Sequence, residues 1–171
     1  YAASHECVQL ALLELGKSLG FKVYTSDPSR KCGDKRLGDV ADLKREDLSK
    51  LIPPDLFDEL SKVDVIWHGY DLYYLFEVTI TTDLRPAFLR FRNAARLNAR
   101  FFIVANESRR REYEKLIKYF SDIARRTEFM EINEILRTRL LTEIWRGTTE
   151  KLNLPYLVQG NTASSDSVDS P

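Results

Sequence analysis

The chain has 171 residues with equal numbers of basic and acidic side chains, 43% hydrophobic and 11% aromatic residues, and few Gly or Pro. Its length suits one domain with a single core, and its composition excludes disordered, collagen-like and linker proteins. The longest apolar run, Val8 to Leu15, is too short to span a bilayer and follows no basic segment of the kind that opens a signal peptide.

Hydrophobic periodicity predicts alternating helices and strands. Ser4 suits the N-cap of the first helix, Gly20 suits its end, and Asp83 suits the N-cap of a later helix. The predicted elements are a helix at 4–19, a strand at 21–24, a short helix near Leu56, strands at 63–68 and 72–80, a helix at 84–97, a strand at 100–105, a helix at 108–126, a strand at 129–132 and a helix to about Trp145. The side chain of Trp145 is expected to pack this last helix against the core. This order is typical of an α/β fold with a mixed sheet between helices.

Residues 1–147 are expected to form one domain, followed by a flexible C-terminal tail at 148–171. The chain begins at Tyr1 rather than Met, and we therefore expect it to be a fragment of a longer protein. Cys7 and Cys32 are 25 positions apart, and neither has a partner at metal-ligand spacing. Two lone thiols suit a reducing compartment better than a disulfide scaffold, so we expect free cysteines in a cytoplasmic protein with no membrane partner.

The charge is balanced only in total. Residues 1–83 hold 10 Lys/Arg and 15 Asp/Glu, a net charge of −5, whereas residues 84–151 hold 16 and 9, a net charge of +7. One interpretation is ordinary solvated helix faces. The other is a carboxylate cluster that binds a cation, next to a basic surface that binds a polyanion.

The stretch from Val63 to Thr79 contains the acids of most interest. Alternation places Glu77 and Thr79 on one face of the second strand, and a hairpin would bring Asp64 on the paired strand near Glu77. Two carboxylates at the ends of apolar strands need compensation, which a divalent cation such as Mg²⁺ or Mn²⁺ supplies. In the alternative, Asp64 caps a strand end and Glu77 pairs with an arginine.

This pattern resembles the PD-(D/E)XK, or restriction-endonuclease-like, nuclease superfamily. Asp64 would be its first acid, Glu77 its second, and Thr79 would occupy its Lys position; Val78 would lend its main-chain carbonyl to the metal. Thr81-Thr82 and Leu89-Arg90 match the Ser-Thr and downstream Arg of one branch, and Glu6 matches the acid of the first helix. The motif spans 63–90, whereas the element order matches over roughly residues 4–132. The resemblance implies an αβββαβ core with a mixed central sheet flanked by helices, and extra helices at the C-terminus.

The resemblance also implies phosphodiester hydrolysis by a metal-bound water, with the metal held by Asp64, Glu77 and the Val78 carbonyl, and a role for Glu6 at a metal-bound water or a second ion. Thr79 departs from the family because a hydroxyl supplies no positive charge. Either Arg90 or Arg85 substitutes for the missing Lys, or catalysis is weak or absent.

Basic residues after the motif are candidates for contacts with phosphates. They occur at helical spacing or crowd the start of the next predicted helix, and they are Arg85, Arg90, Arg92, Arg96, Arg109 and Arg110, with Arg111, Lys115 and Lys118 nearby. In the alternative, Glu107, Glu112 and Glu114 neutralise the second group.

The sequence thus predicts a DNA endonuclease that uses Mg²⁺ or Mn²⁺, of restriction or repair type, acting as a homodimer or as the nuclease domain of a longer chain. RNA stays open as a substrate. The first alternative is a nucleic-acid-binding module that keeps the nuclease fold without catalysis, and the second is a protein-interaction domain whose acids pair with arginines.

Overall fold

The computed structural model describes residues 3–151. In this part of the chain a five-stranded sheet has the order β1-β4-β5-β6-β7, in which the first two pairings are antiparallel and the last two parallel. Its strands are β1 (Lys22–Thr25), β4 (Val65–Gly69), β5 (Leu72–Val78), β6 (Ala99–Ala105) and β7 (Thr127–Glu131). The predicted α/β fold with a mixed central sheet flanked by helices is confirmed.

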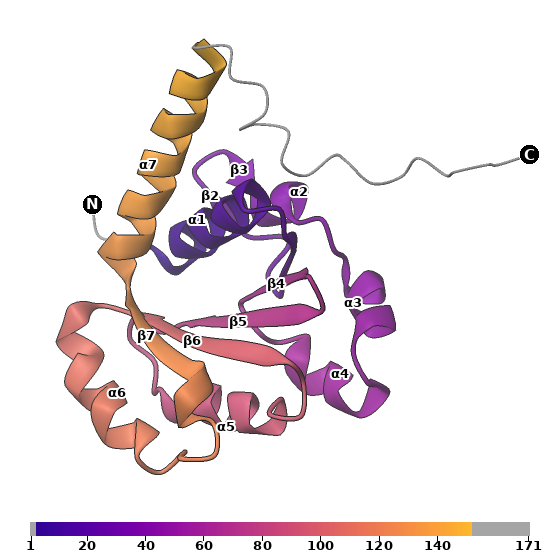
Figure 1. Cartoon of the computed structure of the whole chain (residues 1–171), viewed down its shortest axis with the longest axis vertical. Coiled ribbons are helices and arrows are strands. Elements are labelled where there is room, and N and C mark those ends of the chain that lie inside the picture. The colour runs from indigo at the N-terminus through magenta and orange to yellow at the C-terminus, as the bar shows by residue number, and fades with distance from the viewer. Residues whose placement is uncertain (1–2, 152–171) are drawn as a thin grey trace, which may run out of the picture.

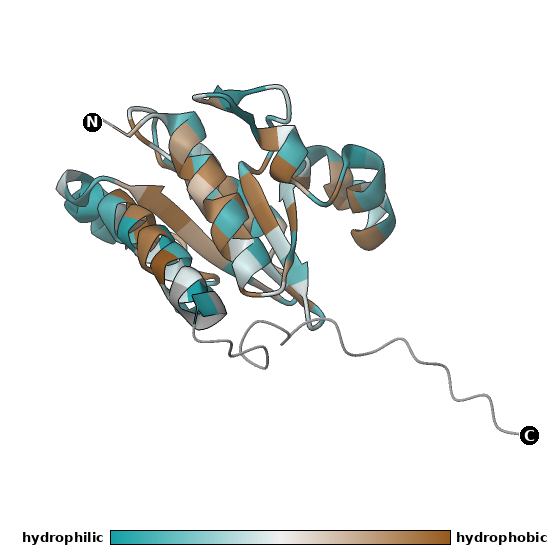
Figure 2. Cartoon of the chain, turned by 90° about the horizontal axis from the view of Figure 1, so that it is seen from above, coloured by the Kyte–Doolittle hydropathy of each residue, from teal (hydrophilic) through white to brown (hydrophobic). Residues whose placement is uncertain are grey.

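Helices cover both faces of this sheet (Figure 1). They are α1 (His5–Ser18), α2 (Leu37–Val40), α3 (Arg45–Leu51), α4 (Pro54–Leu60), α5 (Arg85–Asn93), α6 (Arg110–Ile117) and α7 (Ile132–Lys151). Two short 3-10 turns, Glu107–Arg109 and Ala124–Arg126, and a small hairpin of β2 (Lys31–Cys32) and β3 (Lys35–Arg36) complete the structure. In Figure 2 the strands of the central sheet are largely hydrophobic, whereas the small hairpin is mostly hydrophilic.

Alternation along β5 divides the core into two layers. Leu75 packs with Phe88 and Phe91 of α5 on one face, whereas Phe76 packs with side chains of α1 on the other. The α1 helix begins as predicted, because the Ser4 hydroxyl accepts a hydrogen bond from the Cys7 amide. The sheet is therefore held between two apolar helix layers.

The β4–β5 hairpin has the predicted short connection. Tyr70 and Asp71 both adopt positive φ, as a tight hairpin turn requires. The register pairs Val65 with Phe76, so Asp64, the residue before β4, falls opposite Glu77. The turn and the apolar alternation together bring the two acids to the same edge of the sheet.

Two expected helices differ in length from the prediction. The single helix expected at 108–126 is wrong, because α6 ends at Ile117 and the chain turns so that Phe120 packs on Phe88, with ring centroids 5.0 Å apart. The last helix continues to Lys151, past the boundary expected at residue 147. The rest of the predicted tail, residues 152–171, lies outside the described residues.

Two further expectations are wrong. Cys7 and Cys32 form a disulfide, because the β2–β3 hairpin lies against the start of α1 and brings the two Cα atoms to 4.9 Å. Trp145 does not pack on the core but is 61% exposed, since the second half of α7 extends past the sheet (Figure 1). No helix in residues 3–151 has the length and apolar character needed to cross a membrane.

Gly16 lets α1 approach β4 closely. A Cβ atom at Gly16 would lie 2.5 Å from Trp67 Nε1, which donates a hydrogen bond to the Leu12 carbonyl. We predict that Gly16→Leu lowers the free energy of unfolding by about 2 kcal/mol or more, as measured by denaturant titration. Gly147→Leu in α7 is the matched control, because a Cβ there meets nothing within 4 Å. Equal stability of the two variants would contradict this account.

Candidate active site

The carboxylate of Asp64 is fixed by the strand next to it. Asp64 Oδ2 accepts a hydrogen bond of 2.7 Å from the amide of Val78, the last residue of β5. The main chain of Asp64 also contacts the residue that follows β1, because the Ser26 amide donates to its carbonyl at 3.4 Å. Asp64 therefore lies where β1, β4 and β5 meet, with its side chain directed at the end of β5.

Glu77 is buried beside Asp64, with only 6% of its surface exposed. Arg90 from α5 donates from Nη1 to Glu77 Oε1 at 2.5 Å, and its Nε lies 3.8 Å from Glu59 of α4. Burial, followed by the negative charge of Asp64, raises the pKa of Glu77 to about 8, although Arg90 opposes this shift. The Arg90 guanidinium thus lies next to the carboxylates of both Glu77 and Glu59. Asp64 and Glu77 together hold an excess of negative charge when both are ionised.

Thr79, which the sequence resemblance aligned with a Lys, lies inside the protein. It is 5% exposed, its amide donates to the Val104 carbonyl, and its own carbonyl accepts a hydrogen bond from Arg109. Among the described residues its hydroxyl is buried without a hydrogen-bond partner. Positive charge therefore reaches this region from Arg90 and Arg109 rather than from the strand itself.

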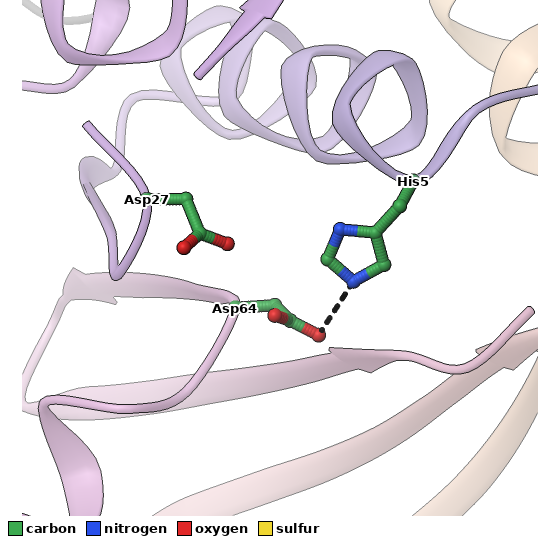
Figure 3. A group of neighbouring side chains, drawn as sticks. All are labelled: His5, Asp27 and Asp64. Carbon is green, nitrogen blue, oxygen red and sulfur yellow. Dashed lines mark ion pairs between the residues drawn. The ribbon is translucent and has the colours of Figure 1, made fainter. Parts of the chain in front are cut away.

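A second group of polar side chains approaches Asp64 from α1 and from the loop after β1 (Figure 3). His5 Nε2 lies 3.4 Å from Asp64 Oδ2, and the amide Nε2 of Gln9 lies 2.9 Å from Asp27 Oδ2 and 3.4 Å from Asp64 Oδ1. The hydrogen bond to Asp64 raises the pKa of His5 above its usual value. Ligand atoms of His5, Asp27 and Asp64 all lie within 4.8 Å of one another.

The first helix contributes different residues from the one expected. Glu6 faces Arg30, 3.8 Å away, whereas the neighbouring His5 contacts Asp64. His5 and Gln9 were not singled out as site residues, although their spacing of four positions places them on one face of a helix. Asp27 is also absent from the predicted site residues, because no sequence pattern connects it with Asp64.

Most of the basic candidates pair with acids inside the chain, as the alternative interpretation expected. The recorded pairs are Arg90–Glu77, Arg92–Asp122, Arg96–Asp55, Arg109–Glu112 and Arg110–Glu107. Arg85 is exposed, and in residues 3–151 it has no recorded acidic partner. The structure therefore brings Arg90 to Glu77 and leaves Arg92, Arg96 and Arg110 on the surface.

Fold and site together define an α/β domain with a carboxylate site at the end of two adjacent strands. The family model described as the type II restriction enzyme NmeDI C-terminal domain matches residues 1–150, and the chain belongs to that family. Comparisons with curated proteins and with solved structures gave no significant match.

Burial of Glu77 predicts a pH-dependent stability. Since its pKa is raised from 4.5 to about 8, the folded chain keeps a proton that the unfolded chain releases. This contribution to stability is complete below pH 4.5 and is lost as the pH rises through about 8. In EDTA, the Tm of the wild type should fall across this range by several degrees more than the Tm of Glu77→Gln. A constant difference between the two proteins across the range would contradict the assignment.

Proposed function

We propose that the chain is a PD-(D/E)XK endonuclease that hydrolyses phosphodiester bonds in DNA with Mg²⁺ or Mn²⁺ held at Asp64 and Glu77. The observation that carries the proposal is the Asp64 carboxylate, hydrogen-bonded to the Val78 amide beside the buried carboxyl of Glu77. Membership in a restriction-enzyme domain family supports DNA as the substrate and cleavage as the reaction.

The order of elements supports the superfamily assignment. The first helix, the antiparallel strands β1, β4 and β5, the helix α5 and the parallel strand β6 follow one another as in the αβββαβ core. Short helices and a small hairpin occupy the insertion between β1 and β4. Asp64 immediately precedes the second strand of this core and Glu77 lies near the end of the third, which is consistent with the superfamily motif.

The donor set suits a hard divalent cation. Asp64, Glu77 and the Val78 carbonyl offer only oxygen atoms, which Mg²⁺ and Mn²⁺ prefer. Burial and the neighbouring charge of Asp64 raise the pKa of Glu77 although Arg90 pairs with it, and a cation would favour the ionised carboxylate. When bound, such an ion lowers the pKa of a water molecule and offsets the charge that develops on the phosphate.

The chain's own residues orient and balance this site. The Val78 amide fixes the direction of Asp64, and burial shields Glu77 from bulk water. Arg90 places a permanent positive charge where the family's Lys would act, but a guanidinium cannot accept a proton as a base does. We therefore assign Arg90 to charge stabilisation and not to deprotonation of water.

The direct test is cleavage of plasmid DNA and of single-stranded DNA with Mg²⁺, Mn²⁺ or EDTA. We predict metal-dependent cutting that falls at least about 100-fold in Asp64→Ala and Glu77→Ala. Glu46→Ala, at an exposed position of α3, should cut like the wild type.

An active homodimer should produce linear plasmid, and an active monomer nicked circles. If the folded wild type cuts neither substrate with either metal, the catalytic proposal is wrong.

Arg90 should be needed for the rate as well as for the fold around Glu77. We predict that Arg90→Ala and Arg90→Lys both lower the cleavage rate, by roughly 100-fold for Arg90→Ala. Arg100→Ala is the matched control, because Arg100 is exposed on β6 and pairs with Glu128. Thermal unfolding of all three variants separates loss of rate from loss of fold. Wild-type rates in Arg90→Ala would exclude Arg90 as the substitute for the Lys.

One observation favours a second candidate, a DNA-binding module with the nuclease fold but without catalysis. Thr79 brings an uncharged, buried hydroxyl to the position where the family has a Lys. Such a module would bind DNA with an affinity that falls steeply with salt and would leave the DNA intact in every metal. A chain that neither binds nor cuts DNA would correspond to the protein-interaction domain.

A further inference from the structure

A second set of cation ligands lies on the α1 side of Asp64. His5 from α1, Asp27 from the loop after β1, and Asp64 present ligand atoms within 4.8 Å of one another (Figure 3). Atoms that bind one ion at about 2.1 Å lie roughly 3.0–3.5 Å apart. The separation of 3.4 Å between His5 Nε2 and Asp64 Oδ2 already falls in this range. The three side chains therefore need little movement to bind one ion.

Gln9 points independently to a ligand at this place. Its side chain is fully buried, one helical turn after His5, and its amide nitrogen is directed at Asp27 and Asp64. Within residues 3–151 its Oε1 is buried without a hydrogen-bond partner. A buried amide oxygen that accepts no hydrogen bond lowers the stability of the fold, so a partner for this oxygen is expected. A 180° rotation of the Gln9 amide group exchanges the positions of Nε2 and Oε1. Oε1 then faces the space between the carboxylates of Asp27 and Asp64.

We propose that His5, Asp27, Asp64 and the Gln9 amide oxygen bind a divalent transition-metal cation such as Zn²⁺ or Mn²⁺. A set of one imidazole nitrogen and three oxygens suits these ions better than Mg²⁺, which favours oxygen ligands and retains its water. The catalytic significance of this second site rests on the proposed function, because Asp64 belongs both to it and to the proposed Mg²⁺ site. Binding itself is independent of cleavage.

Charge balance explains why an ion would be held here. Asp27, Asp64 and Glu77 bring three negative charges to one edge of the sheet, and Arg90 contacts only Glu77 among them. The α1 side has His5 as its neighbouring basic group. A divalent cation would compensate Asp27 and Asp64 together, in place of the hydrogen bonds that Gln9 Nε2 donates to them.

The test is a calorimetric titration of the wild-type chain with Zn²⁺, without DNA and in excess Mg²⁺. We expect one Zn²⁺ per chain at this site and affinities at least about tenfold lower in His5→Gln, Asp27→Asn and Gln9→Met. The matched controls are His68→Gln and Asp34→Asn, which keep the same chemistry outside the cluster and should bind as the wild type does. Unfolding of each variant in EDTA checks the fold.

A nuclear magnetic resonance experiment gives a second readout. The chain has two histidines, so the ring signals of His5 and His68 are assigned with a single variant. Zn²⁺ should shift the His5 signals and leave those of His68, whose ring lies against Tyr73, in place. Unmoved His5 signals, or wild-type Zn²⁺ affinity in His5→Gln, would overturn the proposal.

Glu77→Gln distinguishes failure of this inference from failure of the proposed function. If both are right, Glu77→Gln loses cleavage but still binds Zn²⁺ through His5 and Asp27. If only the metal inference is wrong, the wild type cuts DNA with Mg²⁺ while His5→Gln leaves Zn²⁺ binding unchanged. If only the proposed function is wrong, Zn²⁺ binds as expected and no metal produces cleavage.

Discussion

The hydrogen bond from the Val78 amide to Asp64 fixes a charged side chain where three strands and a helix meet. This bond joins the start of β4 to the end of β5, and the main chain of Asp64 also contacts the residue that follows β1. The other carboxylate oxygen faces Gln9 of α1. A part-buried carboxylate is stable only where donors surround it, so the packing of α1 on the sheet and the position of the acid depend on each other. The close approach of Gly16 to Trp67 sets this packing further along the helix.

Excess negative charge at this edge opposes stability and favours ion binding. A core built only for stability would not bury Glu77 beside Asp64 with Arg90 paired to Glu77 alone of the two, because removal of both acids would release the desolvation penalty. Buried groups with strongly shifted pKa values concentrate at functional sites for this reason. The structure departs from the expected motif at Thr79, whose hydroxyl is buried, and at Glu6, which faces Arg30, whereas Asp64 and Glu77 lie side by side as expected.

The sequence predicted what local rules determine and missed what depends on distant parts of the chain. The N-cap at Ser4 and the apolar alternation of β4 and β5 are local, and they were enough to place Asp64 opposite Glu77. Asp27 reaches the site only because β1 pairs with β4, a contact between segments about forty residues apart. The Cys7–Cys32 disulfide was missed for the same reason, since it depends on how the hairpin lies on α1. The choice of His5 rather than Glu6 depends on the rotation of α1 about its axis, which capping does not determine.

The arginines that the sequence analysis treated as one basic group differ in how far their side chains are buried. Arg92, Arg96 and Arg110 form exposed pairs with acids, and exposed ion pairs contribute little to stability. Phosphates of a nucleic acid can therefore replace those carboxylates at little cost, so internal pairing does not argue against a polyanion partner. Arg90 and Arg109 differ, because their side chains are only 19% and 15% exposed and contact Glu77 and the Thr79 carbonyl. The basic half of the sequence thus supplies two kinds of arginine. One kind is part-buried next to Glu77 and Thr79, and the other is exposed and can exchange its carboxylate partner for a phosphate.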